Sequence, residues 1–214
     1  MSEIIGSLDS LVAQLEAYVP FNEQEEKDRK IILEAIREYR YDLFLRSSQF
    51  AHMTASAWVI TPDVRKVLMV YHNIYQSWSW LGGHADGETD LLKVAVKEVK
   101  EESGLTTVLP VSENIYSLEV LTVDGHEKKG VYVSSHLHLN ITYLLMADST
   151  DSLRMKKDEN SGVQWFDKEQ APNASSETWF RERIYTKLNQ KLEEDTTRTF
   201  LESLDSSIFS GIRK

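Results

Sequence analysis

Apolar residues recur at helical spacing in two segments near the start of the chain. The first segment carries Leu8, Leu11, Val12 and Leu15. Pro20 closes it, so the pattern predicts a short first helix. Asn22, followed three residues later by Glu25, is typical of a second helix start. The apolar face of this second helix carries Ile31, Ile32, Ile36 and Tyr39.

The middle of the chain has the composition of β-strands. Residues 54–60 and 66–71 favour strands, and the turn-forming residues 61–63 between them indicate a hairpin. Residues 78–81 predict a further short strand. Beyond residue 114 the same reasoning predicts strands over 115–123 and 131–146, joined by a polar connection, and a last short strand over 163–166. The spacing of Trp179, Ile184, Leu188 and Leu192 predicts a C-terminal helix.

Residues 82–105, between the predicted strands, begin with a glycine-containing loop and continue into a predicted helix. Glu98, Glu101 and Glu102 fall within about a third of the helix circumference. Like charges at i and i+4 destabilise a helix by roughly 0.2–0.5 kcal/mol per pair, and a divalent cation would compensate them. The alternative is a solvated face whose acids pair with the interleaved Lys93, Lys97 and Lys100.

Two features favour the cation. The stripe next to the acids is apolar, which indicates a docked helix; it consists of Leu91, Leu92, Ala95, Val96 and Val99. Gly82 and Gly83 let the backbone approach an ion or a phosphate, and Gly104 stands where a left-handed cap would end the helix.

Composition limits the function classes. The 214 residues are 41% hydrophobic, enough for one sizeable core, and the formal charge of −10 argues against nucleic-acid polymers and anionic membranes. The chain has no cysteine, which excludes disulfides, zinc thiolates and cysteine nucleophiles. No apolar run approaches the roughly 18 residues of a membrane span, and the first ten residues lack a basic segment that leads into an apolar one. We therefore expect a cytoplasmic protein.

Residues 83–105 resemble the Nudix box, whose pattern is Gly, five residues, Glu, seven residues, then Arg-Glu-aliphatic-any-Glu-Glu-any-Gly-aliphatic. The positions in register are Gly83, Glu98, Val99, Glu101, Glu102, Gly104 and Leu105. Lys97 replaces the arginine of the pattern, and Thr89 stands at its first glutamate, with Glu88 one place earlier. The flanking segments HMTASAWVI, WLGGHADGE, SHLHLN and DENSGVQWF resemble one bacterial branch of the family.

The resemblance implies an α/β fold, the αβα sandwich of Nudix proteins with a mixed sheet. We expect an N-terminal helical extension over residues 1–50, a Nudix domain over 51–170, and a C-terminal helix and tail over 171–214 within the same globular unit. It also implies Mg²⁺ or Mn²⁺, held by Glu98, Glu101, Glu102 and the carbonyl of Gly83. Glu98, Glu101 and Glu159, which lies in a late loop, are the expected choices for the general base.

Substrate contacts are expected from five residues: His84, Glu88, Lys97, His136 and His138. Alternation along a strand places His136, His138 and Asn140 on one face, where they could bind phosphate or sugar, or form a partly wet sheet face. Imidazoles are not primary ligands of a Mg²⁺ site built from oxygens.

The expected function is hydrolysis of a diphosphate linkage in a nucleoside diphosphate joined to another group, with ADP-ribose or a nucleotide sugar as the first choice of substrate. The alternatives are a nucleotide-sensing module without turnover, a prenyl-diphosphate isomerase, which the lack of cysteine disfavours, and an acidic interaction domain. The apolar tail residues also suggest a homodimer; they are Phe200, Leu201, Leu204, Ile208 and Phe209.

Overall fold

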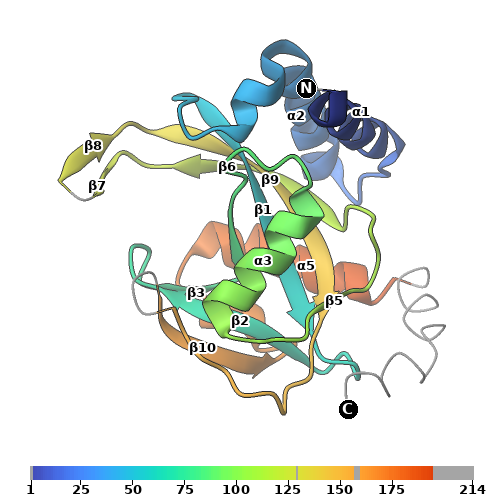
Figure 1. The fold of residues 1–214 in the computed structure, drawn as a ribbon. Coiled ribbons are helices and arrows are strands. Elements are labelled where there is room, and N and C mark those ends of the chain that lie inside the picture. Colours follow the sequence, from blue (N-terminus) through green and yellow to red (C-terminus); the bar gives the residue numbers. More distant parts are fainter. Residues whose placement is uncertain (1, 129, 157–159, 195–214) are drawn as a thin grey trace. The chain divides into compact units, whose positions relative to one another are not determined.

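A computed structural model of the chain describes residues 2–128, 130–156 and 160–194 (Figure 1). The chain divides into two compact units, which are described separately. The first contains Met1–Ser56, Gly82–Ala95 and Glu113–Tyr143, and the second contains Ala57–Leu81, Val96–Ser112 and Leu144–Lys214. The domain boundaries expected at residues 50 and 170 stay a prediction.

The first unit begins with two α-helices and a short 3₁₀ helix, α1 (Ser2–Ala17), α2 (Glu23–Tyr39) and η1 (Arg40–Phe44). The predicted start of α2 is confirmed, because the side chain of Asn22 accepts a hydrogen bond from the backbone N–H of Glu25 at 3.0 Å. The Glu25 side chain reaches back to the N–H of Phe21 at 2.8 Å, so each residue satisfies a backbone donor near the helix start.

The strands of the first unit are the first part of β1 (Ala51–Ile60), most of β4 (Leu81–His84), β6 (Ser117–Val123), β7 (His126–Lys128), β8 (Val131–Val133) and most of β9 (His136–Met146). β6 runs antiparallel to β9 with Glu119 opposite Asn140. β7 and β8 pair as a separate two-stranded ribbon that continues from β6 and leads into β9 (Figure 1).

The second unit contains the rest of β1 and β9, together with β2 (Lys66–His72), β3 (Ser77–Ser79), β5 (Leu109–Pro110) and β10 (Asn160–Asp167). β2 pairs with β1, β3 and β10, all antiparallel. The chain ends its described part in α4 (Ala171–Ala174), the π-helix η2 (Phe180–Tyr185) and α5 (Thr186–Leu192). Trp58 is fully buried and stacks on Tyr185, with ring centroids 5.4 Å apart.

Within the described ranges, eight strands form one sheet along the path β10-β2-β1-β9-β5, to which β3, β4 and β6 add. The fold is therefore mixed α/β, as predicted. Helix α3 (Leu91–Ser103) carries the acidic stripe. No helix in the described part of the chain is both long and apolar enough to cross a membrane.

Two predicted strands and the connection before the second of them differ in detail. Residues 78–81 contain the end of β3 and the start of β4 rather than one strand. The strand predicted over 131–146 is broken between β8 and β9 at Ser134 and Ser135, and the connection predicted over 124–130 contains β7. The break within residues 131–146 and the strand missed within 124–130 have one cause. β7 and β8 pair with each other, and a ladder between short neighbouring segments cannot be recognised from the β propensity of either segment alone.

A buried polar network ties β6 and β9 to β1 in the first unit. Asn140 is 1% exposed, and its Oδ1 accepts hydrogen bonds from Thr54 at 3.0 Å and Ser56 at 2.9 Å. Its Nδ2 donates to Glu119 at 2.9 Å and to Thr142 at 3.0 Å. All four hydrogen-bonding positions of the amide are thus used, so Asn140 belongs to the structural core.

We predict that Asn140→Ala lowers the free energy of unfolding by about 3 kcal/mol, because it leaves buried hydroxyls and a carboxylate without their partner. Denaturant unfolding measures the loss. The matched variant Asn73→Ala changes an exposed asparagine and should shift stability by less than about 0.5 kcal/mol. Equal midpoints for Asn140→Ala and the unchanged protein would show that the network contributes nothing.

Candidate functional site

The loop before α3 is fixed by two acids. Asp90 accepts a hydrogen bond from the N–H of Lys93 at 3.0 Å, which caps the helix. Glu88 accepts from the N–H groups of Thr89 and Asp90 at 3.0 and 3.1 Å, and its other oxygen lies 2.5 Å from Lys93 Nζ. The hydrogen bond from Lys93, followed by that from Asp90, lowers the pKa of the Glu88 carboxyl. In this structure Glu88 therefore holds the turn and neutralises Lys93.

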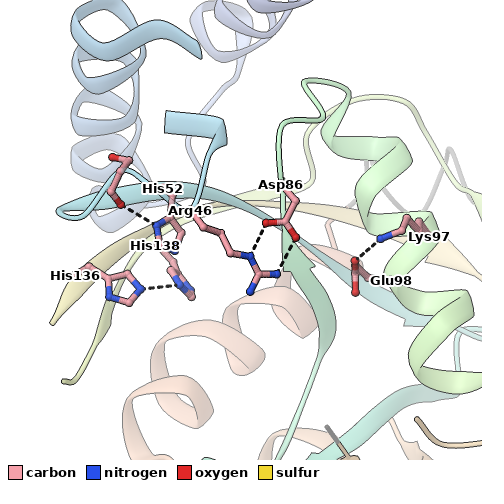
Figure 2. Close-up of polar contacts among 8 residues, drawn as sticks. Arg46, His52, Asp86, Lys97, Glu98, His136 and His138 are labelled. Carbon is pink, nitrogen blue, oxygen red and sulfur yellow. Dashed lines mark hydrogen bonds and ion pairs between the residues drawn. The ribbon is translucent and has the colours of Figure 1, made fainter. Parts of the chain in front are cut away.

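On α3, Lys97 balances two of the three predicted acids. Its Nζ lies 3.0 Å from Glu98 Oε1, as Figure 2 shows, and 3.5 Å from Glu101 Oε1. Lys156 adds a second cation, 3.7 Å from Glu101 Oε2. The hydrogen bond to Glu98 raises the pKa of Lys97, so this amine stays charged. The side chain of Glu98 is only 13% exposed and that of Glu101 is 42% exposed, so the two acids differ in their access to solvent.

Glu102 is the buried member of the set, at 4% exposure. Its Oε1 accepts a hydrogen bond at 3.0 Å from Nδ2 of Asn160, the first residue of β10. Asn160 is itself 1% exposed, and its Oδ1 has no hydrogen-bond partner among the described residues. A buried amide oxygen without a partner costs about 1–3 kcal/mol, so an additional donor or cation would be stabilised beside this pair.

Glycines fix the two ends of the predicted motif. Gly104 has φ +74°, the left-handed cap predicted for it, and its N–H donates to the carbonyl of Lys100 at 3.0 Å. At Gly82 a Cβ atom would lie 2.5 Å from the carbonyl oxygen of Ala55, so only glycine fits there. Gly83 follows in β4.

A cluster of four histidines lies in the first unit. His52 of β1, His84 of β4, and His136 and His138 of β9 have ring centroids 4.6–5.1 Å apart in five pairs. Burial, and then the neighbouring histidines, lower the pKa of His138 to about 2. Burial also lowers the pKa of His52. These two imidazoles are therefore neutral at physiological pH.

In the same unit, the positive charge of Arg46 is neutralised by the carboxylate of Asp86. Arg46 donates from Nε and Nη2 to the two carboxylate oxygens of Asp86, at 2.5 and 2.7 Å, as Figure 2 shows. This bidentate geometry is the strongest form of such a pair.

Seven of the predicted site residues fall into two groups, while Gly83 lies in β4 and Glu88 lies in the loop before α3. One helix carries Lys97 and the three glutamates, and the histidine cluster contains His84, His136 and His138. Glu159 lies outside the described residues. Sequence analysis missed His52, Lys156 and Asn160. The position of Asn160 directly after the predicted base Glu159 was the only signal for it, and His52 is the one ionisable residue of a buried strand.

Chemically, the carboxylate group offers oxygen donors, and the histidine cluster offers nitrogen donors. Carboxylate and amide oxygens suit a hard cation such as Mg²⁺. Neutral imidazoles suit borderline transition metals or hydrogen bonding to an anion. The functional residues thus present two kinds of ligand chemistry.

Known proteins resemble this chain in sequence and in structure. The family model described as the NUDIX domain matches residues 51–188. A search of curated proteins finds no match.

Solved structures similar to this chain include a Caenorhabditis elegans Ap4A hydrolase binary complex, at 16% identity over 74% of this chain and 98% of that one, with a TM-score of 0.45. A MutT protein from Methanosarcina mazei has 15% identity over 66% and 95% of the two chains, with a TM-score of 0.48. An Escherichia coli dihydroneopterin triphosphate pyrophosphohydrolase has 15% identity over 63% and 92%, with a TM-score of 0.47. Because the family model covers more than half of its length, this chain belongs to the Nudix family and is a hydrolase that acts on pyrophosphate bonds.

Proposed function

We propose that this protein is a Mg²⁺-dependent hydrolase that cleaves the diphosphate linkage of a nucleoside diphosphate joined to another group, of the ADP-ribose or nucleotide-sugar type. The observation that carries the proposal is the set of three glutamates on α3, one of them held by a buried amide. A protein that only senses a nucleotide has no need for three carboxylates on one helix face.

The donors suit a hard divalent cation. Glu98, Glu101 and Glu102 would supply carboxylate oxygens, and the buried Oδ1 of Asn160 lies on the side chain that already binds Glu102. Mg²⁺ is bound through oxygen ligands and retains several waters. Among the described residues this amide oxygen has no hydrogen-bond partner, which supports a site that is completed by an ion or by the water that an ion carries.

In the proposed site, Lys97 and Lys156 offset negative charge and do not bind the cation. Lys97 and Lys156 lie close enough to Glu101 to reduce the net negative charge of the acidic face. A diphosphate is itself anionic, so an uncompensated acidic face would repel it. When bound, the metal would neutralise phosphate oxygens and lower the pKa of the attacking water.

Proton transfer requires a carboxylate that reaches solvent. Glu101 is the most exposed of the three glutamates, whereas Glu102 is buried and hydrogen-bonded to Asn160. Glu101 and Glu98 therefore stay choices for the base, and Glu159, which lies outside the described residues, stays the third choice. The base takes a proton from water as the water oxygen bonds to phosphorus. The P–O anhydride bond breaks, and two phosphorylated products leave.

We predict that, with Mg²⁺ and a coupled phosphatase, the protein releases phosphate from ADP-ribose or a nucleotide sugar. Both products are phosphomonoesters, which a phosphatase accepts, while the intact diphosphate diester is protected. A panel that adds nucleoside triphosphates, dinucleotides and isopentenyl diphosphate defines the class, with products separated by chromatography without phosphatase where the substrate has a terminal phosphate. Turnover confined to triphosphates or dinucleotides would overturn the proposed class, and tight binding without turnover would favour a sensing module.

Glu101→Gln and Glu102→Gln should each abolish Mg²⁺-dependent turnover, because an amide keeps the side-chain shape but loses the charge that binds the cation. Steady-state kinetics measures the loss of turnover, and circular dichroism checks that each variant is folded. The control Glu34→Gln/Glu38→Gln removes two charges from exposed positions of α2 and should retain full activity. Wild-type turnover in the Glu101→Gln/Glu102→Gln double variant would refute the role of the stripe.

Asn160→Leu tests whether the hydrogen bond from Asn160 holds Glu102 in place as a metal ligand. We predict that it raises the Mg²⁺ concentration for half-maximal activity by roughly 10–100-fold, the usual effect of losing a residue that orients a ligand. Activity at saturating Mg²⁺ should fall much less. The matched variant Asn173→Leu lies at an exposed position of α4 and should leave the Mg²⁺ dependence unchanged. An unchanged Mg²⁺ dependence in Asn160→Leu would show that Asn160 has no part in the site.

A further inference from the structure

We infer that His52, His84 and His138 form a binding site for a divalent transition metal of the Zn²⁺ class, with His136 available as a fourth ligand. This site uses nitrogen donors and is independent of the hydrolytic function proposed for the glutamates. Four of the six histidines in the chain take part.

The three imidazoles converge from three strands. One nitrogen each of His52, His84 and His138 lies within 4.8 Å of the others. In a tetrahedral site with Zn–N bonds of about 2.0–2.1 Å, neighbouring donors are about 3.3 Å apart. Modest closure of the side chains would therefore bring the three nitrogens to bonding distance of one ion.

Hydrogen bonds to the backbone orient two of the imidazoles. Nδ1 of His52 lies 3.2 Å from the carbonyl oxygen of Ser48, and Nδ1 of His136 lies 2.8 Å from that of Ser134. A carbonyl oxygen only accepts, so each Nδ1 carries the proton and each Nε2 presents a lone pair. Metal-binding histidines are commonly held by this same arrangement.

The Nε2 atoms are placed for a shared ligand. His52 is 7% exposed, and its Nε2 is buried without a hydrogen-bond partner among the described residues. Nε2 of His136 lies 3.3 Å from Nε2 of His138, a pair that Figure 2 shows. This separation equals the spacing of about 3.3 Å between adjacent ligands of a tetrahedral ion. A bound cation would satisfy the buried nitrogen of His52.

The surroundings permit a cation. Arg46 is the cation that acts on His52 and His138, and the carboxylate of Asp86 holds it in a bidentate pair. The local charge is therefore nearly balanced before an ion enters. Nitrogen ligands without carboxylates favour Zn²⁺, Co²⁺ or Ni²⁺ over Mg²⁺, which prefers oxygen.

The first test uses the wild-type protein without an added histidine tag, stripped with a chelator. Zn²⁺ is titrated in millimolar Mg²⁺ against a chromophoric chelator. We expect one Zn²⁺ per chain at micromolar or tighter affinity, together with shifted imidazole ¹⁵N signals for His52, His84 and His138. Absence of binding at micromolar Zn²⁺, or binding without a change in these signals, would overturn the assignment.

Variants locate the site. His52→Gln and His138→Gln should each weaken Zn²⁺ binding at least tenfold. His126→Gln, which changes a histidine of β7 outside the cluster, and Glu101→Gln/Glu102→Gln should bind as the wild type does. Unchanged Zn²⁺ affinity in a folded His52→Gln/His138→Gln variant, or loss of Zn²⁺ binding in the glutamate variant alone, would contradict the inference.

Discussion

Repulsion between carboxylates on one helix face is the constraint around which the second unit is organised. Glu98, Glu101 and Glu102 share a stripe of α3, and each finds a different form of compensation. Lys97 lies against Glu98 and Glu101, Lys156 approaches Glu101, and Asn160 donates to Glu102. Because Glu102 is buried, its hydrogen bond matters most: a buried carboxylate without a partner is far more costly than an exposed one.

The same repulsion is the physical basis of the metal site proposed on α3. Lysine ammonium groups on the exposed side compete with a cation only weakly, since exposed ion pairs contribute little. The buried side holds an amide whose oxygen lacks a partner among the described residues. The stripe thus has compensating partners within the protein and also has donors that an ion would use.

Parts of the fold and site follow from short sequence spacings. The cap at Asn22, the glutamates three and four residues apart, and the glycine that ends α3 all depend on contacts within one turn of helix, so the sequence predicts them. The hairpin of β1 and β2 follows from turn chemistry between two strands.

Long-range placement could not be predicted in the same way. Asn160 reaches Glu102 across 58 positions of sequence, and Asn140 reaches Thr54 across 86. His52 joins His84 and His138 only because β1 is paired with β4 and β9. In each case the partner is chosen by strand pairing, which neither helical spacing nor residue propensity determines.

We propose that the oxygen ligands on α3 and the nitrogen ligands in the histidine cluster bind different metals. Crystals soaked with Mn²⁺ and Zn²⁺, measured at the absorption edge of each metal, test it most directly. We expect a Mn²⁺ anomalous peak beside the carboxylates of Glu101 and Glu102 and a Zn²⁺ peak among the imidazoles of His52, His84 and His138. Mn²⁺ bound away from these carboxylates, or Zn²⁺ bound away from these imidazoles, would contradict it.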